Sequence, residues 1–152
     1  MSETFDKDTA VKQLNRILEL ELAGVVRYTH YALMVFGYNR IPIVSWMQAQ
    51  ADESLLHARE AGELITHLGE HPSLAIGPLL ETERHDVGDI LRESLEHERA
   101  ALEAYRALLA CVEGRSVLLE EYARRMISEE EMHQGEVDKM LRRPGEVSNY
   151  TG

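Results

Sequence analysis

The stretch "ELELAGVVRY" at residues 19–28 returns in altered form as "EHERAALEAY" at residues 96–105. Both follow the pattern E-x-E-x-A-[GA]-x-x-x-Y, and a histidine follows the second glutamate of each stretch after 36 or 35 residues. The residues that correspond in the two halves are Glu21 with Glu98, Tyr28 with Tyr105, and His57 with His133. Two halves that agree in this way predict a pseudo-twofold arrangement with a shared site on its axis.

Four stretches of the chain have apolar residues at the spacing of an α-helix. In the first, Leu14, Leu18 and Ala32 lie on one stripe, and the other three stretches have similar stripes. Gly37 and Pro42 are expected to separate the first helix from the second, because glycine and proline interrupt helices. No stretch alternates apolar and polar residues as a strand would. The predicted helices run from about Thr9 to Phe36, Ile43 to Leu68, Asp86 to Val112, and Val117 to Leu141.

The connection between the second and third predicted helices, residues 69–85, is longer than the other two. Its seventeen residues can extend to about 55 Å, whereas a 26-residue helix is about 39 Å long. The segment can therefore run the whole length of a bundle and leave helices two and three parallel. We predict an all-α four-helix bundle with one long crossover between helices two and three. Residues 1–152 would form one domain, with the bundle at about 9–141 and a short irregular tail at 142–152.

The composition of the chain excludes some classes of partner. Its 152 residues include 16 Lys and Arg against 27 Asp and Glu, a formal net charge of −11. Nucleic acid is not an expected partner, because phosphate binding needs a clustered basic face. Metal cations are expected partners of so acidic a chain. The N-terminus "MSETFDKDTA" does not resemble a signal peptide, and no apolar run has the length of a membrane span. With a single cysteine, Cys111, these features predict a cytoplasmic protein without membrane contact.

Three glutamates lie on helix stripes that are otherwise apolar. Glu21, for example, falls between Leu18 and Val25. A buried carboxylate without a partner is costly, so such groups are paired or bind a metal. Any one of these side chains could instead turn to solvent, but the repetition across two halves favours a common buried site. The three glutamates are Glu21, Glu98 and Glu130.

The arrangement resembles the ferritin-like family, and bacterioferritin most closely. The segments that carry the likeness are "LNRILELELAGVVRY" at 14–28 and "HLGEHPSL" at 67–74, and the resemblance extends over about residues 11–141. Family members use one Glu from each of two helices and a Glu-x-x-His from each of the other two. Carboxylate oxygens and imidazole nitrogens are ligands that iron accepts. The resemblance implies five metal ligands in this sequence: Glu21, His57, Glu98, Glu130 and His133.

The resemblance also implies roles for residues around the metal. Tyr28 matches the family's tyrosine beside the iron centre, although an ordinary buried phenol is an open alternative. Glu53 and Glu129 occupy positions whose acidic residue often fixes the opposite histidine in the family. Each of them could equally be a solvated surface charge.

The sequence departs from the family at the second Glu-x-x-His. Residues 54–57 read "SLLH", so Ser54 stands where a bridging glutamate is expected. Four glutamates neutralise two divalent ions, whereas three leave a net charge of +1 and favour a single ion or weak occupancy of the second position. A π-bulge that brings Glu53 into the vacant place is an alternative.

Two further departures concern haem and assembly. Leu55 stands where bacterioferritin has its haem-ligating methionine, and Met47 is more than two turns away, so no haem is expected there. The tail "RRPGEVSNYTG" at 142–152 lacks the apolar face of the family's fifth helix, which puts a 24-subunit shell in doubt. The segment "YALMVFGY" at 31–38 has more apolar residues than one inward stripe needs, which predicts a homo-oligomer, at least a dimer.

The favoured function is iron binding in iron homeostasis, with oxidation of Fe(II) by oxygen or peroxide as the reaction, impaired if Ser54 removes one bridge. A rubrerythrin-like peroxidase is an alternative, and it would need an outside electron donor because no rubredoxin-type cysteine pairs are present. A bundle that has lost catalysis and serves as a binding or assembly module, with at most one structural ion, is another. The sequence does not decide whether the chain is an enzyme, which residues would be catalytic or what the oxidant is. It also does not decide whether the oligomer has two, 12 or 24 subunits.

Overall fold

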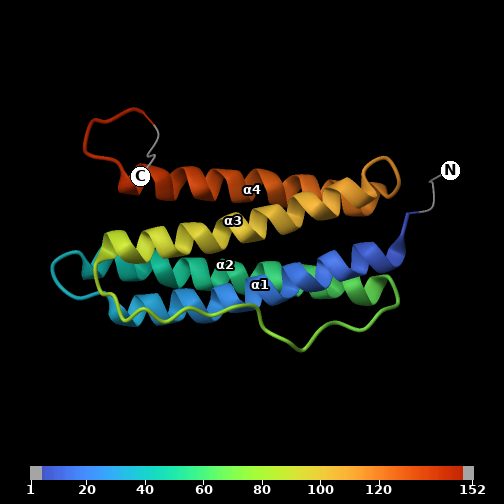
Figure 1. Ribbon diagram of the computed structural model, residues 1–152, viewed down its shortest axis with the longest axis horizontal. Coiled ribbons are helices and arrows are strands. Elements are labelled where there is room, and N and C mark those ends of the chain that lie inside the picture. Colours follow the sequence, from blue (N-terminus) through green and yellow to red (C-terminus); the bar gives the residue numbers. More distant parts are fainter. Residues whose placement is uncertain (1–4, 149–152) are drawn as a thin grey trace.

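Four long α-helices make up a computed structural model of the chain, which describes residues 5–148 (Figure 1). No strand occurs among those residues. The helices are α1 (Lys7–Met34), α2 (Arg40–His67), α3 (Val87–Val112) and α4 (Val117–Leu141). The predicted all-α four-helix bundle is confirmed. The first four residues of the predicted polar N-terminus and the last four of the tail, 149–152, lie outside the described residues.

The helix boundaries follow from local capping. The side chains of Asp6 and Asp86 cap α1 and α3 by accepting hydrogen bonds from backbone amides in the first turn. The first helix begins and ends two residues before the approximate bounds predicted, at Lys7 and Met34. The predicted break at Pro42 is wrong, because α2 begins at Arg40 and contains this proline. Proline is tolerated there because the amides of the first turn have no partner within the helix.

The connection between α2 and α3, residues 68–86, passes along the outside of α1 (Figure 1). The Ser73 hydroxyl donates to the Glu19 carboxylate over 2.6 Å, and the Gly77 amide donates to the Glu19 carbonyl oxygen over 2.9 Å. A Cβ atom on Gly77 would lie 3.0 Å from that oxygen, so the close approach requires glycine. The segment is the predicted long crossover, and it leaves α2 and α3 parallel.

The apolar core is divided into two clusters along the bundle axis. In α1, Leu20 belongs to one cluster and Tyr28 to the other. In α4, Met126 belongs to the first and Val137 to the second. The buried polar side chains of all four helices lie at the level between the clusters. Four apolar residues on the helix stripes that face inward are only partly buried: Val25, Leu68, Val87 and Met140.

Among residues 5–148, none of the helices combines the length and apolarity that a membrane span requires. After Leu141, no further helix follows within the described residues.

Candidate metal centre

The five predicted metal ligands line one small cavity at the middle of the bundle, and each of the four helices contributes at least one of them. The cavity has a volume of about 10 Å³, close to the space that one water-sized species occupies. Three carboxylates are nearly inaccessible, with exposed fractions of 3% for Glu21, 5% for Glu98 and 6% for Glu130. The structure therefore brings together the side chains that the repeat singled out, and metal binding by them stays a prediction.

Each helical hairpin supplies one histidine–glutamate pair to the cavity. His57 Nδ1 lies 3.3 Å from Glu21 Oε2, and His133 Nε2 lies 3.3 Å from Glu98 Oε2. Burial opposes the charged form of His57, but the carboxylate of Glu21, with further carboxylates nearby, outweighs it and raises the pKa to about 9. Burial likewise opposes ionisation of Glu98, yet His133 lowers the pKa of Glu98 to about 2. The two imidazoles thus compensate much of the negative charge.

Two tyrosines connect the hairpins by crossed hydrogen bonds. Tyr28 of α1 donates to the carboxylate of Glu98 on α3 and also lies 3.2 Å from His133 Nε2. Tyr105 of α3 donates to Glu21 Oε2 on α1 over 2.5 Å. Burial, together with the adjacent carboxylates, raises the pKa of both phenols, which keeps them neutral donors. The pseudo-twofold pattern of the sequence reappears as two equivalent tyrosine–glutamate pairs.

Glu130 is the least satisfied group in the centre. Its Oε2 atom is buried and has no hydrogen-bond partner within the described residues. Burial, followed by the negative charges of Glu98 and Glu21, raises the pKa of Glu130 to about 12. A buried oxygen without a partner is costly in a protein interior. Its position in a cavity of atomic size, among other carboxylates, is suited to a cation.

Ser54 supplies no carboxylate to the cavity, as the sequence predicted. The residue is buried and lines the cavity, with its hydroxyl turned towards α1, where a Cβ atom on Gly24 would lie 2.8 Å from Ser54 Oγ. Helix α2 remains α-helical through residues 53–57. The alternative of a π-bulge at Glu53 is therefore wrong for this structure, although Glu53 also lines the cavity without one.

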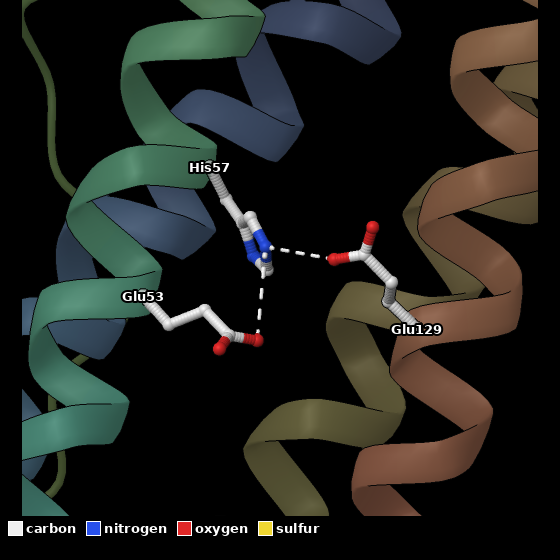
Figure 2. Close-up of side chains that lie close together, drawn as sticks. All are labelled: Glu53, His57 and Glu129. Atoms are coloured by element: carbon white, nitrogen blue, oxygen red, sulfur yellow. Dashed lines mark ion pairs between the residues drawn. The ribbon is translucent and has the colours of Figure 1, made fainter.

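Two half-exposed carboxylates approach the outer side of His57 (Figure 2). Glu53 Oε1 lies 3.8 Å and Glu129 Oε1 lies 3.4 Å from His57 Nε2. Arg125 binds the other oxygen of Glu129 over 3.1 Å. Glu129 therefore contacts the opposite histidine as the family resemblance implies, whereas Glu53 pairs with the histidine of its own helix, one turn away.

Three further side chains contribute to the centre beyond the predicted ones. Tyr105 is one of them, and its match with Tyr28 in the repeat is the signal that indicates its place there. Trp46 stacks on His133 with ring centroids 5.8 Å apart, and Gln50 lines the cavity. No periodic or repeated feature of the sequence distinguishes Trp46 or Gln50 from ordinary residues of α2.

Comparisons with known proteins place the chain beside proteins of one fold. Residues 11–144 match the family Ferritin, described as a ferritin-like domain. A ferritin-like diiron-carboxylate protein of Bacillus anthracis str. Ames superposes with a TM-score of 0.82 at 23% identity, over 92% of this chain and 100% of the other. The bacterioferritin-related dodecameric thioferritin of Bacteroides fragilis superposes with a TM-score of 0.82 at 22% identity, over 90% of this chain and 86% of the other.

The bacterioferritin of Desulfovibrio desulfuricans, whose diiron site is known in different catalytic states, gives a TM-score of 0.75 at 26% identity, over 89% of this chain and 79% of the other. No curated protein matches the sequence.

Proposed function

Because this chain belongs to the ferritin-like domain family, we propose that it is a bacterioferritin-like iron-binding protein of iron homeostasis. The ligands would be the five side chains that line the central cavity. Three carboxylates and two imidazoles form a donor set of hard oxygen and borderline nitrogen atoms, which fits Fe(II) and Fe(III). These ligands are Glu21, His57, Glu98, Glu130 and His133.

The observation that carries the proposal is the unpartnered Oε2 atom of Glu130. It lies in a cavity of about 10 Å³ together with the other four candidate ligands. The large majority of buried side-chain oxygens in proteins have a hydrogen-bond partner. A cation bound there would satisfy Glu130 and remove the need to keep its carboxyl protonated.

The proposed reaction is the oxidation of Fe(II), the substrate, by oxygen or peroxide. Iron supplies the redox chemistry, and the chain supplies ligands and a shaped cavity. Tyr28 and Tyr105 would hold the carboxylates of Glu98 and Glu21 in place through their hydrogen bonds. Glu130 and His57 would release protons when a cation binds, because both must be deprotonated to act as ligands.

Ser54 limits the proposed activity. With three buried glutamates in place of four, the cavity compensates one divalent ion and leaves a second one short of a bridging carboxylate. We expect one ion per chain to bind tightly in the cavity and oxidation to be slow. A non-catalytic module with a single structural ion is the second candidate function, and the buried Ser54 is the observation that favours it.

The proposal includes a cytoplasmic homo-oligomer, at least a dimer. In the segment 31–38, Leu33 and Phe36 are each 67% exposed, and Tyr38 is fully exposed. Exposed apolar groups at this density are typical of contact surfaces, and the described bacterioferritin-related relative of Bacteroides fragilis is dodecameric. Light scattering should give at least twice the mass of one chain, and a monomer at micromolar concentration would refute this part.

An aerobic Fe(II) titration with a metal count tests the function. We expect wild type to bind at least one iron per chain tightly and to oxidise Fe(II) faster than buffer does. Glu98→Gln should abolish tight binding, whereas Glu103→Gln, an exposed glutamate of the same helix, should bind as wild type does. Tight binding of one ion without oxidation would favour the non-catalytic module, and no binding at all would refute the proposal.

A further inference from the structure

We propose that a divalent cation also binds on the outer side of His57, held by His57 Nε2 and by the carboxylates of Glu53 and Glu129. This inference rests on the proposed function, because it concerns where the chain accommodates a cation for which the inner cavity lacks a carboxylate. The three side chains come from α2 and α4 and face one another at the surface of the bundle (Figure 2).

The distances in this cluster suit a shared ion. One atom from each of the three side chains lies within 4.8 Å of the other two. The two carboxylate oxygens are 3.8 Å and 3.4 Å from His57 Nε2. Ligand atoms bound to one ion at about 2.0–2.2 Å lie roughly 3–4 Å apart. Small movements of the half-exposed Glu53 and Glu129 side chains would therefore close the coordination.

The inner neighbours of His57 orient the ring for an outer ligand. The ring's other nitrogen, Nδ1, lies 3.3 Å from Glu21 Oε2, and Glu21 accepts a hydrogen bond from Tyr105 over 2.5 Å. An Nδ1–H that donates to Glu21 leaves the Nε2 lone pair free towards Glu53 and Glu129. With the outer ion bound, His57 therefore does not bind the inner ion, whose ligands are then Glu21, Glu98, Glu130 and His133. Metal-bound histidines commonly donate their second ring N–H to a carboxylate in this way.

The local negative charge and the absence of a glutamate at position 54 both favour a cation at His57 Nε2 over one at Nδ1. Glu53 and Glu129 with a neutral imidazole carry a charge of −2, which matches a divalent cation. Ser54 supplies no carboxylate on the inner side, and Glu53, the carboxylate of α2 that also lines the cavity, approaches His57 at Nε2 and not at Nδ1. Arg125, which binds the second oxygen of Glu129, reduces the local negative charge and holds the first oxygen at His57. The side chains of Glu53 and Glu129 are 52% and 42% exposed, so the ion should exchange freely with solvent.

Crystals soaked in Zn²⁺, which undergoes no redox reaction, test the position directly through an anomalous difference map. The proposal predicts a peak about 2.0–2.2 Å from His57 Nε2, with Glu53 and Glu129 as the other protein ligands. A peak bonded to His57 Nδ1 inside the cavity, with none outside, would overturn this inference and leave the proposed function standing. No peak at either position would overturn both.

Zn²⁺ titration of variants gives an independent readout in solution. Glu129→Gln, at a carboxylate that does not line the inner cavity, should weaken the outer ion at least tenfold and leave the inner ion unchanged, and Glu98→Gln should do the reverse. Glu136→Gln, which removes an exposed carboxylate of the same helix, α4, is the matched control and should keep both ions. If Glu129→Gln and Glu136→Gln bind Zn²⁺ with the same number of sites and the same affinities, the outer site does not exist.

Discussion

Replacing Glu130 by glutamine should stabilise the metal-free protein. Glutamine keeps the shape of the protonated carboxyl but cannot ionise. Burial and the neighbouring carboxylates raise the pKa of Glu130 from 4.5 to about 12, so the folded chain keeps it neutral at pH 7. The unfolded chain ionises the same group and is stabilised by doing so. At neutral pH, wild type should therefore have a lower free energy of unfolding than Glu130→Gln.

The size of this difference follows from proton linkage. A group whose folded pKa is raised contributes stability that is complete below its unfolded pKa and is lost as the pH rises towards the folded value. Between the ordinary value of 4.5 and pH 7 the loss is about 3 kcal/mol, at 1.36 kcal/mol for each pH unit. For a chain of this size that corresponds to a rise in Tm of about 6–12 °C for the variant.

Thermal unfolding in a chelator at pH 7 and pH 5 measures the effect. The advantage of Glu130→Gln should fall below about 1 kcal/mol at pH 5, because pH 5 lies only about half a unit above the unfolded pKa of the carboxyl. Glu136→Gln, at an exposed position of α4, should match wild type at both pH values. An advantage that is absent at pH 7, or equal at the two pH values, would falsify the claim that Glu130 is neutral in the folded, metal-free protein.

Three further predictions concern the same centre. Ser54→Glu should allow two ions to bind in the cavity and speed Fe(II) oxidation, because Gly24 blocks the other direction for a longer side chain; a metal count unchanged from wild type would contradict this. Tyr105→Phe leaves Glu21 without its phenol donor and should cost about 1–3 kcal/mol in urea unfolding, whereas an unchanged midpoint would show that the bond contributes nothing. Since the folded pKa of His57 is raised to about 9, the metal-free protein should lose about 2 kcal/mol between pH 6.5 and pH 9.5, a step that should be missing in pH-dependent denaturation of His57→Gln.

The sequence was sufficient for the bundle and for the inner ligand candidates, for identifiable reasons. Helical periodicity predicts the four helices, and the middle connection is long enough to allow a crossover. The repeat singles out Glu21 and Glu98 because a glutamate on an apolar stripe needs a partner, and both lie in the cavity. The start of α2 was misplaced because proline interrupts a helix only beyond its first turn.

Other features depend on side-chain directions that no sequence pattern encodes. Glu129 reaches the outer nitrogen of His57 because α2 and α4 face each other there, which is a matter of how the hairpins dock, whereas Glu53 approaches it from one turn away on the same helix. Trp46 stacks on His133 for the same reason. Both contacts join the two hairpins, and a repeat within the hairpins contains no information about contacts between them.

The path of the crossover makes the two sides of the bundle unequal. Segment 68–86 is hydrogen-bonded to Glu19 of α1 and, through Thr82, to Glu93 of α3. It therefore covers the side of the bundle where α1 and α3 meet. The opposite α2–α4 seam is bridged by polar side chains, among them the Arg125–Glu60 pair at 2.8 Å. On the proposed function, ions would reach the cavity from the α2–α4 side, where the exposed Glu53 lines it, and a partner bound on that side would block their entry.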